Sequence, residues 1–375
     1  MGIRIAKRNL NVCLNPYDEQ QIQNIATFKN KGLSYAAGRT CYYILKFPVC
    51  INATTYYSVK IKGAGYYNGS ADVIKPGFSE FLRRDSHYGF DENGNVIEAY
   101  SDVAPFGGIT KSKAYREYGN FEHLSKNNVS TLMAYELLEY DNLFFKGEPL
   151  AVVVALCTEK YPLRMYKLLW PADRNSQDEI TYYQLIAEHE GISEDIKKFT
   201  TGSCLIQKIA QKYAREIKKF SHAGLYIHSG GWSNIQYNLQ ANNIVLIDLD
   251  STRQINEKNK KFCTLYAKRD FVSNIYRLLI SIYNPDIIMQ YDDNNIMQTN
   301  YVFHLLYGYF GKVYDRYILK NISENILNFY VKSCFNNIKQ IEEKMTTMSD
   351  EEAREYELKM FEFYSFCLAQ IEDLD

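Results

Sequence analysis

The sequence predicts an α+β fold, with a β-rich N-terminal part followed by a helical C-terminal part. The first part contains short alternating runs rich in Tyr, Val and Ile, which are typical of strands. Toward the C-terminus, apolar residues recur at the steps of three and four that are typical of amphipathic helices. The simplest division falls near residues 160–172, so we expect domains at residues 1–160 and 161–375.

The N-terminal elements follow from local patterns. The runs "CYYILKFPVCI" and "TYYSVKIKG" predict a β-hairpin with its turn at Asn52-Ala53-Thr54. The glycine-rich stretch from Gly63 to Gly119 is irregular and predicts an insertion or small subdomain. "STLMAYELLEY", residues 130–140, has helical spacing behind Ser130 as N-cap, so a helix is expected there. The apolar run "EPLAVVVALCT" then predicts a strand.

The C-terminal elements are mostly helical. "GSCLIQKIAQKYAREIKKF" places apolar residues on one face, and "RDFVSNIYRLLISIY" predicts a second apolar helix. A final helix is expected behind a capping box formed by Ser349 and Glu352. Between the first two helices, "NNIVLID" predicts a turn and a strand that ends on Asp248.

Charge and composition narrow the function classes. A formal net charge of −1 provides no global field that would favour nucleic acid, so we expect no nucleic-acid partner. The eight cysteines form no C-x-x-C pair, which argues against a zinc module and a dense disulfide framework. Neither a signal peptide nor a membrane span is expected, and we predict a cytoplasmic protein, with delivery to another cell left open.

Two segments place residues that suit nucleotide chemistry. A predicted short hairpin begins near Asn234 and ends on Asp248, which would bring their side chains together at one end, and their oxygens are ligands that Mg²⁺ accepts. Lys60 and Lys62 share one face of a strand because they occupy alternate positions, and a strand lysine suits phosphate groups. Arg39, in "YAAGRT", is a further candidate for contact with a phosphate. Taken alone, the same patterns also fit turn-capping residues and solubilising lysines.

Over residues 221–252 the chain resembles a kinase catalytic centre. "REIKKFSHAGLYIHSGGWSNI" followed by "IVLIDLDS" is similar to the catalytic loop and metal-binding segment of aminoglycoside-phosphotransferase-type kinases. The resemblance implies a two-lobed protein-kinase-like fold, with Asn234 and Asp248 as metal ligands and Asp250 as an extra ligand or base. The chain departs from that family at Gly230, which stands where the family carries its catalytic Asp.

The lysine strand resembles a different kinase-like family. "KIKGAGYYNGSADVIKPGFSEFL" is similar to the selenoprotein-O family, which lacks the same Asp and transfers AMP to protein hydroxyls. By this resemblance Lys62 binds the nucleotide and Glu80 pairs with the lysine. Glu136 is the alternative partner, and the first choice, because it lies on the predicted helix directly before the apolar strand. Glu139 is expected to be surface charge.

Together these patterns predict an atypical transferase that uses ATP and Mg²⁺ to move a phosphoryl or adenylyl group to a hydroxyl, with a protein as the first candidate acceptor. Two alternatives stay open. Gly230 favours an inactive pseudokinase that binds a nucleotide or a partner, whereas the catalytic-loop resemblance favours a small-molecule kinase. The oligomeric state cannot be predicted from these patterns.

Overall fold

The computed structural model describes most of the chain in two compact units. The first unit is Met1–Leu163 with Ile227–Ser229 and Gln236–Gln254, and the second is Arg164–Tyr226, Gly230–Ile235 and Ile255–Asp375. The expected boundary at residue 160 is close to the first of these limits, but residues 236–254 group with the N-terminal unit. The described residues are 2–35, 38–67, 80–84, 89–90, 96–97, 101–168, 175–228, 231–257, 260–283, 299–335 and 361–374, with only the backbone described at 80–84, 89–90, 96–97, 101–104 and 334–335.

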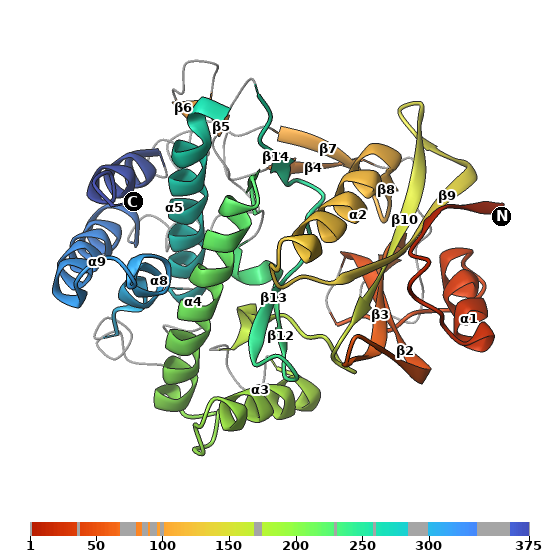
Figure 1. The fold of residues 1–375 in the computed structure, drawn as a ribbon, viewed down its shortest axis with the longest axis horizontal. Helices are drawn as coiled ribbons and strands as arrows, with labels where there is room; N and C mark the ends of the chain where they lie inside the picture. The colour runs from red at the N-terminus through yellow and green to blue at the C-terminus, as the bar shows by residue number, and fades with distance from the viewer. Residues whose placement is uncertain are drawn as a thin grey trace. The chain divides into compact units, whose positions relative to one another are not determined.

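The first unit is built on an antiparallel sheet (Figure 1). The strand order is β1-β9-β10-β3-β2, and β8 also pairs with β10. These strands are β1 (Ile3–Arg8), β2 (Gly38–Ile51), β3 (Thr54–Tyr67), β8 (Ile109–Thr110), β9 (Met133–Phe145) and β10 (Glu148–Cys157). The predicted hairpin is confirmed as β2 and β3, and its turn places Asn52 and Ala53 at positive φ.

The prediction of a helix over residues 130–140 is wrong, because most of this segment belongs to strand β9. Nearly every residue from Ala134 to Tyr140 is buried, including Glu136 and Glu139. A strand covered on both faces loses its alternation of apolar and polar residues, so its pattern also fits a helix. The expected strand that follows is confirmed as β10.

Two helices cover opposite faces of this sheet. α1 (Pro16–Ala26) packs against β2 and β3, and its apolar residues share a core with Val59 and Ile61 of β3. α2 (Lys111–Lys126) packs against β9 and β10, and contacts Lys60 and Lys62. Since successive side chains of a strand point to opposite faces, β3 has an apolar face toward α1 and a charged face toward α2. Part of the expected insertion over residues 63–119 is therefore the first half of α2.

The second unit is helical, so the predicted α+β class, with its β-rich part before its helical part, is confirmed (Figure 1). α4 (Phe199–His222) packs against α5 (Cys263–Ile282) and α8 (Tyr301–Phe310), and its buried residues follow one face. Both predicted helices, at residues 202–220 and from residue 269, are confirmed as α4 and α5. The capping box at Ser349 lies outside the described residues. The helices are α3 (Gln177–His189), α4 (Phe199–His222), α5 (Cys263–Ile282), α8 (Tyr301–Phe310) and α9 (Arg316–Tyr330).

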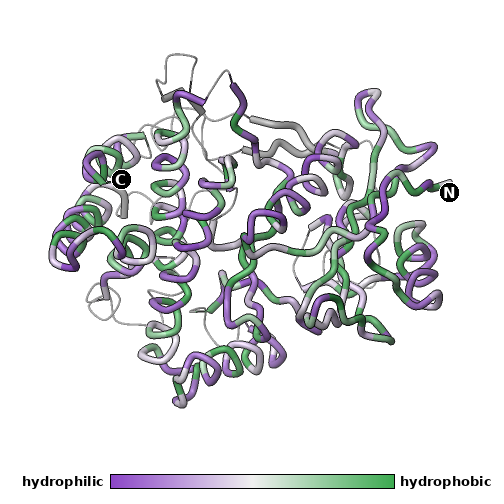
Figure 2. Tube along the Cα trace, in the orientation of Figure 1, coloured by the Kyte–Doolittle hydropathy of each residue, from purple (hydrophilic) through white to green (hydrophobic). Residues whose placement is uncertain are grey.

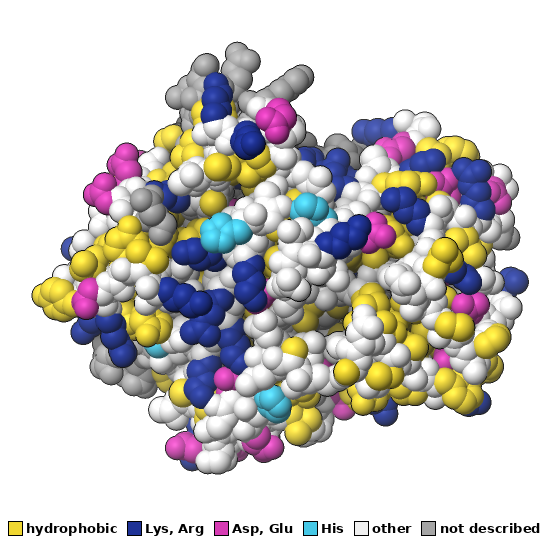
Figure 3. Space-filling model, viewed as in Figure 1, with side chains coloured by type: hydrophobic (Ala, Val, Ile, Leu, Met, Phe, Trp, Pro, Cys, Tyr) yellow, Lys and Arg dark blue, Asp and Glu magenta, His cyan; other side chains and the backbone are white. Residues whose placement is uncertain are grey.

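The exposed side of α4 is basic. Figure 2 shows hydrophobic and hydrophilic residues interleaved along α4, and Figure 3 shows Lys and Arg side chains gathered over it. Part of this charge is compensated, since Lys212 pairs with Glu190 and Lys219 with the buried Glu216. Within the part of the chain that is described, no helix is long and apolar enough to cross a membrane.

Candidate active site

The charged face of β3 meets one glutamate of α2. Lys60 and Lys62 are both buried, and Lys60 Nζ lies 3.2 Å from Glu117 Oε1. Lys62 donates to the other carboxylate oxygen of Glu117. Glu117 itself has no exposed side-chain surface. Two strand lysines are thus held from one side by a single helical carboxylate.

Asp248 approaches Lys62 from the end of a second hairpin. This hairpin consists of β12 (Ile235–Asn238) and β13 (Asn243–Leu246), and Leu246 is fixed by a backbone hydrogen bond of 2.9 Å to Ser130. The chain then turns, and the Asp248 carboxylate accepts a hydrogen bond from Lys62. The strand expected from the apolar run "NNIVLID" is confirmed as β13, but it ends at Leu246, and Asp248 lies in the turn that follows.

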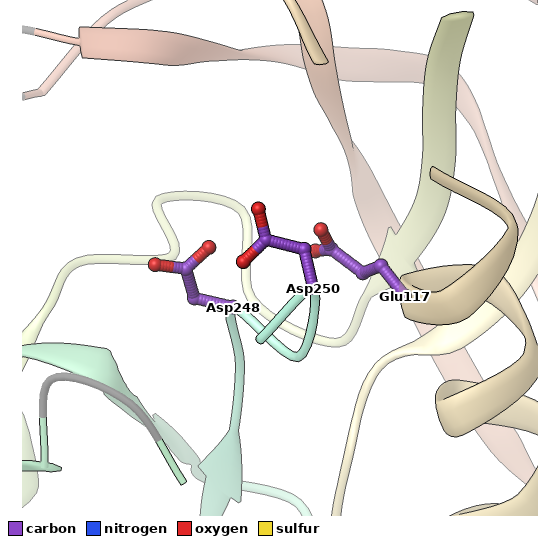
Figure 4. Close-up of side chains that lie close together, drawn as sticks. All are labelled: Glu117, Asp248 and Asp250. Atoms are coloured by element: carbon purple, nitrogen blue, oxygen red, sulfur yellow. The ribbon is translucent and has the colours of Figure 1, made fainter. Parts of the chain in front are cut away.

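Glu117, Asp248 and Asp250 form an acidic cluster, and we use this name for the three residues throughout (Figure 4). Each offers one oxygen, and these oxygens lie within 4.8 Å of one another. Lys62 contacts all three acids, with a distance of 3.5 Å from its Nζ to Asp250 Oδ2. Of the three side chains only Asp248 reaches the surface, at 15% exposure. Asp248 is therefore the acid best placed to contact a ligand.

Arginine and asparagine side chains hold the segment around Asp250. Arg39 Nη2 lies 2.5 Å from Asp250 Oδ2, and Arg39 Nη1 donates to the Gly108 carbonyl at 3.3 Å. Arg116 Nη1 donates to the Asp250 carbonyl at 3.0 Å, and Asn120 donates to the neighbouring carbonyl of Leu249 at 3.0 Å. Arg116 and Asn120 both lie on α2, so this helix fixes the backbone of the segment as well as Lys62.

Backbone strain marks both of the segments that the sequence singled out. Asp248 has φ +62°, in the left-handed region, where Asp is tolerated better than most residues. Ile227, next to His228, has φ +65°, and a β-branched residue is rarely found there. Such conformations persist where the surrounding structure enforces them, often at functional sites. The strain at Asp248 fixes the direction in which its carboxylate leaves the chain.

The donor set of the acidic cluster fits a hard divalent cation. Carboxylate oxygens are preferred by Mg²⁺, which takes one or two of them and completes its shell with water or phosphate oxygens. The ammonium group of Lys62 contacts the same three carboxylates, so a cation would share this site with a lysine able to bind phosphate. The acidic cluster and Lys62 thus place carboxylate oxygens and an ammonium group within one small site.

The catalytic-loop residues are described only in part. Asn234 belongs to the second unit, where its side-chain oxygen accepts a hydrogen bond of 3.0 Å from Arg164 Nη1. His228 is fully buried. Gly230 lies outside the described residues. The assignment of Asn234 as a metal ligand stays a prediction.

The lysine-pairing glutamate is Glu117 rather than Glu136. Glu136 is on β9 and pairs with Arg8 of β1, and burial raises its pKa above the ordinary value. The side chain of Glu80 lies outside the described residues, and its backbone belongs to β4 (Glu80–Arg84). Sequence reasoning missed Glu117 because the stretch around it appeared irregular. The apolar positions of "AYREYGNF", interrupted by Gly119, were the signal for helix α2.

Glu139 is a structural anchor of α2 and not surface charge. Its side chain is only 4% exposed and pairs with Arg4 of β1 at 2.6 Å and with Lys111 of α2 at 3.0 Å. Burial opposes ionisation, but hydrogen bonds from Tyr115, Arg4 and Lys111 lower the pKa of Glu139 to about 2. Glu139 thereby ties the N-terminal end of the helix that carries Glu117 to the sheet.

Comparisons with known proteins add little to this geometry. The sequence matches no protein-family model and no curated protein. Among the matching solved structures is one described as "WaaP in complex with acyl carrier protein", which is 10% identical. That alignment covers 88% of this chain and 98% of the other, with a TM-score of 0.36. Because a likeness of this strength supports no inference about activity, the site must be interpreted from its own residues.

Proposed function

We propose that this protein is a kinase-like transferase that depends on ATP and Mg²⁺. It moves a phosphoryl or adenylyl group to a hydroxyl, and a protein is the first candidate acceptor. One observation supports this most strongly. Lys62, on a strand, is bound both by Glu117 of a helix and by Asp248 at the end of a hairpin. In kinases a strand lysine paired with a helical glutamate binds phosphates, and a separate aspartate holds the metal.

The residues divide the work by their positions. Lys62 binds phosphate oxygens through its ammonium group, and Glu117 holds that ammonium in place. Arg39 holds Asp250 through an ion pair. Positioning and charge neutralisation account for most of the catalysis in a phosphoryl transfer with a loose transition state, so the absence of an Asp at position 230 does not by itself exclude this reaction.

Asp248, with Asp250 as the second candidate, would hold Mg²⁺. A bound Mg²⁺ neutralises charge on the phosphate oxygens of the nucleotide. Asp248 suits this role because its carboxylate is the one in the acidic cluster that reaches the surface. Its left-handed backbone aims the carboxylate before any ligand binds.

Isotope transfer tests the proposal. The purified protein is incubated with Mg²⁺ and ATP labelled at either the α- or the γ-phosphate, with protein and small-molecule hydroxyl acceptors. Label from the γ-phosphate is expected for a kinase, and label from the α-phosphate for an adenylyl transferase. Asp248→Asn and Lys62→Met should each abolish transfer. Lys126→Met is the matched control for Lys62→Met, because Lys126 is an exposed lysine at the far end of α2.

Thermal shift distinguishes the alternatives. A stabilisation by Mg²⁺ and ATP that needs Lys62 and Asp248, without transfer to any acceptor, would favour the nucleotide-binding pseudokinase. If no transfer is observed, and no thermal shift depends on these two residues, nucleotide binding at this site is contradicted.

A further inference from the structure

A hollow lies between α2 and the segment at residues 252–254, within the first unit. Its volume is about 260 Å³. One wall is a face of α2 and the other is the segment that follows Asp250. The lining residues include two arginines and no acid: Tyr115, Arg116, Gly119, Asn120, Thr252, Arg253 and Gln254. The composition of its walls favours an anion.

Gly119 creates part of this space. A Cβ atom added to Gly119 would meet no atom within 4 Å, so close packing does not require glycine here. Glycine inside a helix costs roughly 0.5–1 kcal/mol relative to alanine. The chain therefore has a destabilising residue in the middle of α2 that no described contact explains, while the hollow opens at this position. The open space at Gly119 is part of the hollow.

Residues that line the hollow also form the hydrogen bonds that hold the segment around Asp250. Arg116 donates to the Asp250 carbonyl at 3.0 Å, and Asn120 donates to the Thr252 carbonyl at 3.3 Å. Gln254 contacts the Asn120 side chain at 3.5 Å. Arg253 is exposed at the rim, and its Nη1 donates to the Ser251 carbonyl at 3.2 Å. A ligand in the hollow would bridge α2 and the segment that carries Asp250.

We propose that this hollow is a binding site for a small phosphate-type anion of about the size of pyrophosphate. Two guanidinium groups in a concave site match the charge and fork geometry of phosphate oxygens. Its volume of about 260 Å³ lies just below the range of about 300–1,000 Å³ that is typical of pockets for drug-sized ligands, which suits a small anion. The proposal does not depend on the proposed transferase activity.

Calorimetric titration of the full chain with inorganic pyrophosphate, in EDTA to remove divalent cations, tests the site. Arg253→Glu reverses a charge at the rim, and Gly119→Leu fills the hollow from α2. Each is expected to weaken binding at least tenfold. Lys126→Glu, the same charge change on the exposed end of α2, and Gly119→Ala, which leaves room, are expected to retain most of the affinity.

The variants also separate this hollow from the acidic cluster. Lys62→Met should leave the binding of pyrophosphate in EDTA intact, and bound pyrophosphate should slow hydrogen exchange in α2 and at residues 250–254. Binding that is lost in Lys62→Met but kept in Arg253→Glu would place the anion at the cluster and overturn the proposal. An equal loss in Lys126→Glu, or no binding by the wild type, would overturn it as well.

Discussion

Replacing Glu117 with Gln should destabilise the first unit strongly, because one carboxylate serves two buried lysines. Lys62 keeps Asp248 and Asp250 as partners when the charge of Glu117 is removed. Lys60 loses the one acid with which it forms an ion pair among the described residues. The cost of the substitution therefore comes mainly from Lys60, a buried ammonium group with 2% of its side chain exposed.

The separation of the two groups gives the magnitude. At 3.2 Å between Lys60 Nζ and Glu117 Oε1, Coulomb's law with an effective dielectric constant of about 20 gives an attraction of about 5 kcal/mol. Removing one partner of a buried pair typically costs about 3–5 kcal/mol, since the other charge stays buried. We expect Glu117→Gln to cost about 3–4 kcal/mol, and the added substitution Lys60→Met to recover about 2 kcal/mol of it.

Urea unfolding of the full chain, followed by circular dichroism, measures the free energy, and hydrogen exchange in β3 peptides assigns the loss to the first unit. Glu122→Gln, on the same helix but partly exposed, is the control and should change stability by about 0.5 kcal/mol or less. If the double variant is no more stable than Glu117→Gln, an unpaired Lys60 does not explain the cost and the reasoning is refuted.

Three further substitutions test the contacts that stabilise the first unit around the site. Asp18→Ala should cost about 3 kcal/mol in urea unfolding, because the buried carboxylate accepts hydrogen bonds from two backbone N–H groups of β2 and from a tyrosine. Gly63→Ala should lower the thermal midpoint by several degrees, since φ is +99° and a Cβ would lie 2.5 Å from the Ala151 carbonyl. Glu139→Gln should lower stability at pH 7 and flatten its decline in acid. The pKa of Glu139 falls from 4.5 to about 2 on folding, so its contribution is complete above about pH 4.5 and is lost toward pH 2.

Local sequence patterns predicted an element correctly where the pattern fits only a strand or only a helix. The hairpin β2–β3 and the strand β10 carry β-branched and aromatic runs between turn residues, and α4 has a single apolar face. The sequence of strand β9 suggested a helix because a strand that is buried on both faces shows no alternation of apolar and polar residues. Whether both faces are buried depends on how the whole sheet packs. α1 and α2 lie on opposite faces, and no residue of β9 itself shows that both faces will be covered.

The site was predictable where a residue's position on its own element decided its direction. Lys60 and Lys62 share a face by strand geometry, and Asp248 follows a strand that ends beside them. Their partner Glu117 is on a helix whose centre is broken in the sequence by Gly119, so the sequence pattern favoured Glu136 instead. Which carboxylate meets a buried lysine depends on how a distant helix packs, and spacing along the chain does not contain that information.

The charge balance of the site leads to a last prediction, that metal and nucleotide bind cooperatively. The three carboxylates of the acidic cluster face three cations, Lys60, Lys62 and Arg39, so this group of described side chains is close to neutral. Mg²⁺ alone would leave an excess of two positive charges in a buried site, and ATP alone would place its phosphates against Asp248. Together they offset each other.

We therefore expect millimolar Mg²⁺ alone to raise the thermal midpoint little. Mg²⁺ with ATP should raise it by more than the two separate shifts combined, as linkage requires for ligands that stabilise each other. Asp248→Asn should remove the part of the combined shift that exceeds the sum of the two separate shifts. It should leave part of the shift with ATP alone, because Lys62 still contacts phosphate. Strictly additive shifts in the wild-type protein would mean that metal and nucleotide do not meet at this cluster, and the assignment of Asp248 would have to be abandoned.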